Sequence, residues 1–496
     1  MASIPIHLKR KDLLGGTNLD GYLAGGPDRY PFMTTKEMRN GAFVLTHLGD
    51  ESTHLCANIE LPGVGRVMGT TGNLMPREKP YNLLLELLRG KICRLRNQSS
   101  DWEMLGLETP PHLKSVLSQL CQILGRVVTC EGDDVDENAC IEGLVRAHKL
   151  GDEVTAVYTQ RVLEIRKERT PKLPTRFAVG LGENFEPFEL SAAALANFPF
   201  HQIHIPFPWR QLEPVQGQYQ WQKADRMIES AMASRIEVSA GPIIDFRHNA
   251  MPDWIMSGKV DPHRLSSYLT KHLHVVLNRY QGIIRHWTIL LGANLGEVFD
   301  LDEDEWLRLS FHLCDVAAKS GSKANLVLGI SQPAGELMAN EPRNYSPLGF
   351  AETMVRTGLP LAAIELDMVM GTSPRGGALR EILEVSRMID AFGFLGKPIR
   401  LVVGFPSAGD PDPLADPGQA VGPGRLGAQY TAEGQQAWVR QYLELLICKP
   451  QVEEIRWCHF DDRAPHVYPY CGLIDTKGQL KPAFGDLLAL RRKHLI

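Results

Sequence analysis

The sequence contains no uninterrupted apolar run of 18 residues, and this absence excludes a membrane-spanning helix. Long blocks of one charge are also missing: 53 Lys and Arg face 58 Asp and Glu, and the net charge of −5 is spread along 496 residues. This balance argues against nucleic acid and membranes as partners. The first residues lack the apolar stretch of a secretory signal, so we expect a cytoplasmic protein.

Cysteine is scarce and scattered. The nine cysteines form no Cys-x-x-Cys pair, so we expect reduced, mostly buried thiols rather than a disulfide framework or a zinc ribbon. No glycine-rich phosphate-binding motif follows a strand-like segment, which argues against a nucleotide. We therefore expect no cofactor and no metal; His459, beside Asp461 and Asp462, is a weak metal candidate.

What the sequence does contain is typical of a globular protein, with 44% hydrophobic and 22% charged residues. Its length favours more than one domain. Residues 166–175 are charged, include two prolines and lack periodicity. We therefore predict an N-terminal β-rich domain with helices over 1–130, a helical connector and linker over 131–174, and a barrel over 175–496.

The region before residue 170 combines β-type runs with helical patterns. Gly41–Leu45 and Leu55–Leu61 are short apolar runs bounded by turn residues, which predict strands. Helical periodicity covers Tyr81–Cys93, His112–Val128 and 137–168. This region could be a sugar-binding module or a dimerisation element, and the sequence leaves both this choice and the oligomeric state open.

After residue 175, eight short apolar segments alternate with amphipathic helical patterns. The predicted strands are 177–183, 203–209, 236–246, 284–294, 326–331, 362–370, 399–405 and 454–461. Eight such units in about 320 residues predict an α/β fold, a (β/α)8 TIM barrel. An open, doubly wound sheet is the alternative.

The active residues of such barrels lie where the strands end. In this chain those positions hold carboxylates, histidines and aromatic rings, including Glu183, Asp245, Asp367 and His459. Aromatic faces stack on sugar rings, and paired carboxylates catalyse glycosidic acid–base chemistry. The inventory therefore predicts a site for an oligosaccharide or polysaccharide.

Four blocks of the barrel half resemble glycoside hydrolase family 10, the endo-xylanase family. Trp209–Trp221 resembles its Lys-Trp-x-x-x-Glu-Pro motif, and His248–Trp254 resembles the motif that ends its third strand. Trp457–Asp461 and Gly472–Phe484 resemble its strand-8 and closing motifs. The resemblance covers nearly all of residues 175–496 and implies hydrolysis of O-glycosidic bonds.

The same resemblance places Gly292 where the family has its acid/base glutamate and Val403 where it has its nucleophile. Neither residue can perform those roles. The segment Ile364–Asp367 imitates the nucleophile motif, but it lies one βα unit too early, and we assign it to the sixth strand.

Two hypotheses follow. In the first, relocated carboxylates hydrolyse the glycoside, with Glu297 and Asp367 as the catalytic candidates. In the second, the protein is a catalytically silent glycan-binding or scaffold pseudoenzyme. In either case the predicted substrate-binding residues are Trp209, Asp245, His248, Asn294, Trp457 and Asp461.

Overall fold

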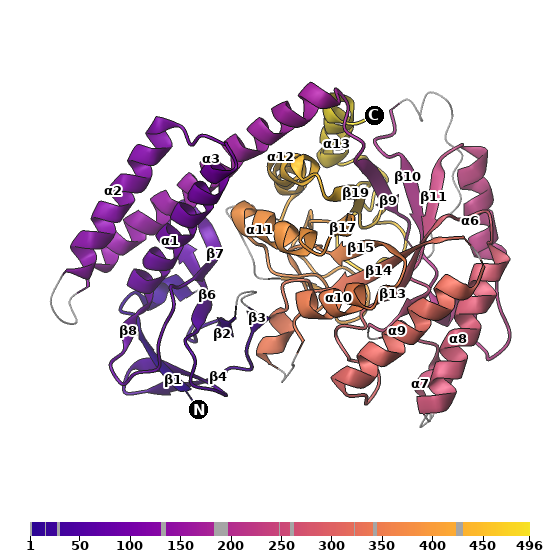
Figure 1. The fold of residues 1–496 in the computed structure, drawn as a ribbon, viewed down its shortest axis with the longest axis horizontal. Helices are drawn as coiled ribbons and strands as arrows, with labels where there is room; N and C mark the ends of the chain where they lie inside the picture. The colour runs from indigo at the N-terminus through magenta and orange to yellow at the C-terminus, as the bar shows by residue number, and fades with distance from the viewer. Residues whose placement is uncertain are drawn as a thin grey trace.

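The structure is a computed structural model that describes residues 2–14, 16–26, 30–129, 135–182, 197–247, 249–257, 262–321, 323–340, 345–422 and 430–496. Two regions lie side by side in it, an N-terminal β-plus-helix region and a larger barrel (Figure 1). The long helix α3 (Glu137–Arg169) runs from the first region to the second.

The N-terminal region contains two four-stranded sheets, in the orders β4-β5-β1-β8 and β3-β2-β6-β7. Their strands are β1 Ala2–His7, β2 Gly21–Gly25, β3 Tyr30–Pro31, β4 Thr35–Arg39, β5 Ala42–His47, β6 His54–Leu61, β7 Gly65–Thr70 and β8 Tyr81–Asn82, and a 3-10 turn, η1, covers Lys11–Leu14. The helices α1 (Leu83–Met104) and α2 (Pro111–Val128) follow. The strands and helices predicted for this region are all present.

Helix α3 belongs to both regions. Its first half packs with α1 and α2, and Leu144 and Leu150 are buried in the N-terminal core. Near its end Leu163 joins the barrel core, and Arg166 donates a hydrogen bond to the carbonyl of Ile447. Helix α3, which lies within the predicted connector over 131–174, thus packs against both regions.

The barrel is a closed parallel sheet with helices outside it. Its strands are β9 Arg176–Gly180, β10 Gln202–Ile205, β11 Glu237–Ala240, β12 Ile244–Asp245, β13 His286–Leu291, β14 Asn325–Ser331, β15 Leu361–Asp367, β17 Ile399–Val403 and β19 Val452–Trp457. Pairing of both β11 and β12 with β13 closes the ring. The predicted eight-stranded barrel is confirmed, and the open-sheet alternative is excluded.

The third barrel strand differs from its prediction, because 236–246 is divided into β11 and β12. The division falls at Gly241 and Pro242. Gly241 has a φ of +131°, and a Cβ there would lie 2.4 Å from the carbonyl oxygen of Thr288 on β13. Pro242 has no N–H to donate to a neighbouring strand, so regular pairing stops and resumes two residues later.

The remaining elements surround the barrel or connect its strands. They are α5 Trp209–Leu212, α6 Gln222–Ala233, α7 Asp253–Met256, α8 Pro262–Arg279, α9 Glu303–Lys319, α10 Pro347–Arg356, α11 Ile382–Gly393, α12 Ala432–Cys448, α13 Pro482–His494, the 3-10 turn η2 Glu336–Ala339 and the short strand pair β16 Thr372–Ser373 and β18 Ala420–Val421. The segment Ile364–Asp367 lies in β15, the sixth barrel strand, as predicted.

The two regions are joined through a buried carboxylate at the start of α11. One oxygen of Glu381 lies 2.5 Å from Lys91 Nζ of α1 and 2.9 Å from His148 Nδ1 of α3. Burial alone would raise the pKa of Glu381, but Lys91 and His148 outweigh it and hold this pKa well below its usual value. Leu383 extends the N-terminal core into the same helix.

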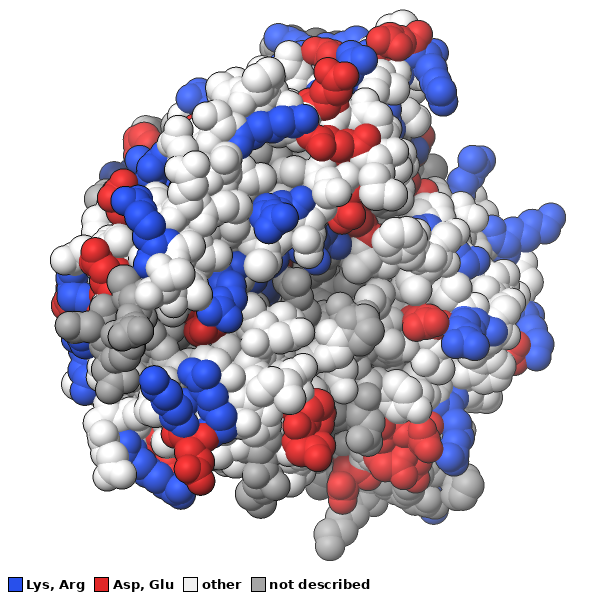
Figure 2. Space-filling model, turned by 60° about the vertical axis from the view of Figure 1, so that its left-hand side comes forward, with Lys and Arg blue, Asp and Glu red and all other residues white. Residues whose placement is uncertain are grey.

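Within the described ranges, no helix is both long and apolar enough to cross a membrane. Eight cysteines in those ranges carry free thiols, as expected. Figure 2 shows Lys and Arg side chains interspersed with Asp and Glu over the face that it displays.

Candidate functional site

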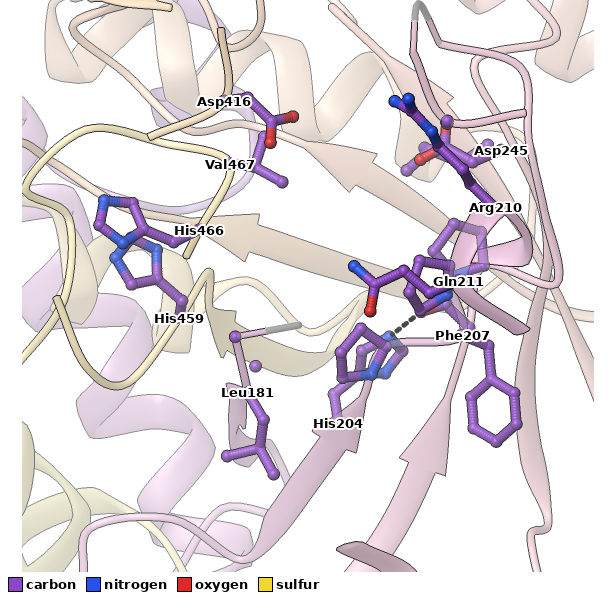
Figure 3. Close-up of a pocket in the computed structure, with 18 of the residues that line it drawn as sticks. Leu181, His204, Phe207, Arg210, Gln211, Asp245, Asp416, His459, His466 and Val467 are labelled. Atoms are coloured by element: carbon purple, nitrogen blue, oxygen red, sulfur yellow. Dashed lines mark hydrogen bonds between the residues drawn. The ribbon is translucent and has the colours of Figure 1, made fainter. Parts of the chain in front are cut away.

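A cavity of about 1240 Å³ opens where the barrel strands end. Its lining comes from several strand ends and from the loops that follow them. The polar lining residues include His204, Asp245, Arg247, Glu365, Asp367, Arg375, Asp416, Arg456, Cys458, His459, His466 and Tyr468. In Figure 3, His459 and His466 lie on one side of this cavity, and Asp245 and Arg210 lie on the other.

Two carboxylates share one guanidinium at the top of the barrel. Arg247 donates from Nε and Nη2 to both oxygens of Asp245, at 2.7–3.1 Å. Its Nη1 lies 3.1 Å from Asp367 Oδ2 and 3.3 Å from the Tyr468 hydroxyl. Tyr468 in turn donates to Asp367 Oδ2 at 2.5 Å. We name these four residues the carboxylate cluster.

The two carboxylates differ in their electrostatics. Burial raises the pKa of Asp367 above its usual value, and Arg247 offsets this only in part. Burial acts in the same direction on Asp245, but the charge and hydrogen bonds of Arg247 outweigh it, so the pKa of Asp245 is lowered. Pairs of acids whose pKa values are pushed apart are typical of acid–base sites.

Asp367 also has an unused oxygen. Its side chain is 4% exposed, and Oδ1 has no hydrogen-bond partner among the described residues, whereas Oδ2 accepts from two donors. A proton on this carboxyl group therefore belongs on Oδ1, since Oδ2 is already occupied by donors. An unpaired, buried polar atom beside a cavity is a place where a ligand can gain a hydrogen bond.

Below the carboxylate cluster, the lumen holds a satisfied ionic network. Arg456 Nη2 lies 2.6 Å from Glu365 Oε1, and Thr288 donates to Glu365 Oε2 at 3.0 Å. Arg456 Nη1 also donates to Nδ1 of His204 at 2.6 Å. Burial, followed by the charge of Arg456, holds the pKa of His204 well below its usual value. Because Glu365 is fully paired, we assign it to the framework of the site.

His459, Asp462 and His466 bring three possible ligand atoms within 4.8 Å of one another. Each nitrogen that could bind a metal is engaged, however. His459 contacts Cys458 and Asp462, and His466 contacts Asp412 and the carbonyl of Ala464. The second oxygen of Asp462 lies 2.5 Å from Lys481 Nζ. The donor set is arranged as an internal hydrogen-bond network and not as an open metal site.

The two tryptophans predicted to stack on sugar are packed inside the protein. Trp209 is 2% exposed, stacks on His272 with ring centroids 4.1 Å apart, and donates to Glu213. Trp457 is 1% exposed and donates to the carbonyl of Cys471. Neither is among the residues that line the described cavity.

The other predicted residues are spread over several environments. Asn294 exchanges hydrogen bonds with the backbone of Ser331 and ties the loop after β13 to the end of β14. Asp461 binds Arg463 through both oxygens. Glu297 is exposed on the loop after β13. His248 and Glu183 lie outside the described residues.

The structure constrains both positions at which the resembling family has its catalytic glutamates, Gly292 and Val403. Gly292 has a φ of +79°, and a Cβ there would lie 2.7 Å from Cγ of Arg247. Val403, 1% exposed, packs in the core between the barrel and its helices, whereas Val402 lines the cavity. Of the predicted catalytic and substrate-binding residues, Asp245 and Asp367 line the cavity in the described structure, as does His459, the weak metal candidate.

Sequence reasoning missed Arg247 and Tyr468. Arg247 follows Asp245 by two residues, a spacing that lets its guanidinium fold back on that carboxylate. Tyr468 follows β19 by eleven residues, and nothing in the sequence shows that it reaches Asp367.

A closed parallel barrel with acids, arginines and histidines around its mouth is the architecture of a glycoside hydrolase-like protein. The sequence comparisons agree. The family described as "Glycosyl hydrolase family 10" matches residues 206–306, so the barrel is similar to that of this family of carbohydrate-active proteins.

Curated relatives align over the same part of the barrel. Endo-1,4-beta-xylanase A of Fusarium oxysporum f. sp. lycopersici is 26% identical over 82 residues, which are 16% of this chain and 24% of the relative. Endo-1,4-beta-xylanase 1 of Gibberella zeae is 26% identical over 82 residues, 16% of this chain and 23% of that relative. The chain thus spans about a quarter of the length of these relatives.

Among solved structures, native xylanase 10B from Thermotoga maritima is similar, with 17% identity and a TM-score of 0.46 over 66% of this chain and 98% of that one. An endo-1,4-beta-xylanase from Caldicellulosiruptor owensensis has 14% identity and a TM-score of 0.47 over 65% and 98% of the two chains.

Proposed function

We propose that this protein hydrolyses O-glycosidic bonds of an oligosaccharide bound in the barrel-mouth cavity. The observation that carries the proposal is the carboxylate cluster: two acids on one guanidinium, with pKa values displaced in opposite directions. Glycosidic hydrolysis needs one carboxyl that holds a proton and one that stays ionised.

The roles follow from the contacts. Asp367 is the general acid, because its raised pKa favours the protonated form and Oδ1 makes no hydrogen bond to the described residues, so a proton there is not engaged within the protein. Asp245 is the ionised carboxylate, which stabilises positive charge at the sugar ring and accepts the proton of the attacking water. Arg247 and Tyr468 hold the two acids in place.

The substrate class rests on the similarity to xylanases together with the cavity. A volume of about 1240 Å³ has room for several sugar units, and its lining offers many hydrogen-bonding groups. We propose a β-linked xylo-oligosaccharide as the first substrate to test.

A silent, glycan-binding protein is the second candidate, and one observation favours it. Both oxygens of Asp245 are already bound by Arg247, and the backbone at Gly292 leaves no space for a side chain. A carboxylate so engaged is a weak base.

The test is the release of reducing sugar from xylo-oligosaccharides and of aryl alcohol from aryl β-xylosides. Asp367→Asn should lower kcat by at least about a hundredfold, the usual contribution of a general acid. Asp461→Asn is the matched control, since Asp461 is a buried, arginine-bound aspartate away from the cavity. Saturable binding without turnover in the wild-type protein would select the second candidate, and full activity of Asp367→Asn would overturn the assigned roles.

A further inference from the structure

The wall of the cavity formed by β19 carries a thiol that the proposed hydrolysis does not use. Cys458 directly follows β19, and its side chain lines the cavity. Its sulfur lies only 2.5 Å from where a Cβ on Gly404 would be, beyond the end of the neighbouring strand β17. The glycine therefore leaves the space that the sulfur fills.

The thiol is the first member of a hydrogen-bonded series. Cys458 Sγ lies 3.6 Å from Nδ1 of His459, and Nε2 of His459 lies 2.9 Å from Oδ1 of Asp462. Asp462 is held in turn by the backbone N–H of Gly472 at 2.7 Å and by Lys481 at 2.5 Å. A nucleophile, a base and a carboxylate that orients the base are the parts of a covalent catalytic site.

The surroundings favour the ionised form of this pair. Burial would raise the pKa of the Cys458 thiol, but a hydrogen bond from Cys471 and the charge of His459 outweigh burial and lower it to about 6. Burial would lower the pKa of His459, but Cys458 and Asp462 raise it to about 9. Both shifts favour the thiolate–imidazolium form of the pair over the neutral form.

Three groups of the described residues lie against the pair. Cys471 approaches the sulfur, Asp462 binds the far side of the imidazole, and the ring of His466 stacks on His459 with centroids 4.4 Å apart. Figure 3 shows the two stacked rings on one side of the cavity.

From this geometry we infer that Cys458, His459 and Asp462 form a second catalytic site, which cleaves a carboxylic ester by acyl transfer to the Cys458 sulfur. Ester carbonyls are the electrophiles that thiolate–imidazolium pairs attack in general. That the esterified hydroxyl belongs to a sugar rests on the proposed function, because both sites open into one cavity.

The step balances without a further reactant besides water. The thiolate sulfur forms a bond to the carbonyl carbon, the carbon–oxygen bond to the alcohol breaks, and the leaving alkoxide takes the proton from Nδ1 of His459. A water molecule then gives a proton to His459, and its hydroxide attacks the thioester. The products are the alcohol and the free acid, and the thiolate–imidazolium pair is restored.

The first test is alkylation of the reduced, full-length protein with iodoacetamide, followed by peptide mapping. At about pH 6.5 an ordinary thiol is almost wholly protonated. Cys458 should be alkylated at least about tenfold faster than the exposed Cys93, despite its partial burial. Alkylation of Cys93 at an equal or higher rate would overturn the inference.

The second test uses p-nitrophenyl acetate, an ester without a sugar, so that its result does not depend on glycoside turnover. We expect a burst of nitrophenol and one acetyl group on Cys458 by mass spectrometry. Cys458→Ser should abolish the burst, and His459→Gln should slow it at least about a hundredfold, while Cys93→Ser leaves it unchanged. Acetylation elsewhere with Cys458 unmodified would contradict the inference.

The two proposals fail separately. Acylation of Cys458 without glycoside hydrolysis would support the thiol site but would overturn the assignment of a sugar ester as its substrate. Glycoside hydrolysis without acylation of Cys458 would overturn the inference of a thiol site and leave the proposed glycoside hydrolysis supported.

Discussion

At the residue scale, Arg247 contacts both aspartates of the carboxylate cluster through different nitrogens. Replacing it by Met would leave Asp245 and Asp367 buried beside each other without a counter-charge. Breaking a buried pair by removing one partner costs about 3–5 kcal/mol. We expect a loss of that size in the free energy of unfolding, measured by urea denaturation at neutral pH.

The chain supplies a control for this substitution. Arg463 binds Asp461 with the same two-residue spacing and the same donor pattern as Arg247 and Asp245, but the Arg463 side chain is 54% exposed. Arg463→Met should cost less than Arg247→Met, because one aspartate rather than two loses its partner and the Arg463 side chain already lies largely in solvent. Equal losses in the two variants would show that Arg247 has no special role.

The Arg247→Met deficit should also depend on pH. Without the guanidinium, the pKa values of both acids rise, and both become neutral in acid. The deficit should therefore shrink as the pH is lowered from 7 toward about 4, the ordinary pKa of Asp. Urea denaturation at several pH values measures it, and a constant deficit would mean that lost packing, not charge, is the cause.

The sequence predicted only some of the residues that form the candidate site. Asp245 and Asp367 could be predicted because the active residues of such barrels lie where the strands end, and both lie near the end of a predicted strand. Arg247 and Tyr468 could not be selected, because their roles depend on contacts between distant strands. The roles predicted for Trp209 and Trp457 required exposed rings, and the sequence does not show which face of the barrel wall a tryptophan occupies.

At the element scale, the end of β13 is shaped by Gly292. Its φ of +79° suits glycine, and a Cβ would meet Arg247 at 2.7 Å. Gly292→Ala should lower the free energy of unfolding by about 3 kcal/mol or more, since backbone strain and a clash add. Thermal and urea denaturation measure this.

The substitution Gly282→Ala separates the effect of backbone strain from the effect of the steric clash. Gly282 has a similar φ of +78°, but a Cβ there would meet nothing within 4 Å. Gly282→Ala should therefore show the strain alone, about 1 kcal/mol. Losses of the same size at both positions would contradict the clash at Gly292.

Most of the barrel strands were predictable because they are largely buried and rich in apolar residues. The break between β11 and β12 could not be predicted from the sequence, because it depends on the close approach of Gly241 to Thr288 on another strand. The packing of α3 against both regions likewise depends on partners far away in the sequence.

At the scale of the whole molecule, Glu381 joins the N-terminal region to the barrel. Glu381→Gln would remove the salt-bridge partner of the buried Lys91, which should cost about 3–5 kcal/mol of unfolding free energy. Glu142→Gln is the control, because Glu142 pairs with Arg146 on the surface of α3 and is 68% exposed. The control should cost less than about 1 kcal/mol.

The sign of the pH dependence follows from the lowered pKa of Glu381. A carboxylate of this kind contributes stability above its unfolded pKa of about 4.3, and the contribution is lost as the pH falls further. The difference between wild type and Glu381→Gln should therefore shrink below about pH 4. A difference that persists there would contradict the ionic role.

The most direct measurement of the central claim is the pH dependence of kcat/KM for an aryl β-xyloside. The account predicts a bell-shaped profile, in which the rate falls in acid as Asp245 is protonated and falls in base as Asp367 loses its proton. The basic limb should lie above the ordinary pKa of Asp, about 3.9, and Asp367→Asn should lose nearly all activity. An Asp367→Asn variant with the same pH profile as the wild-type protein would contradict the roles assigned to Asp245 and Asp367.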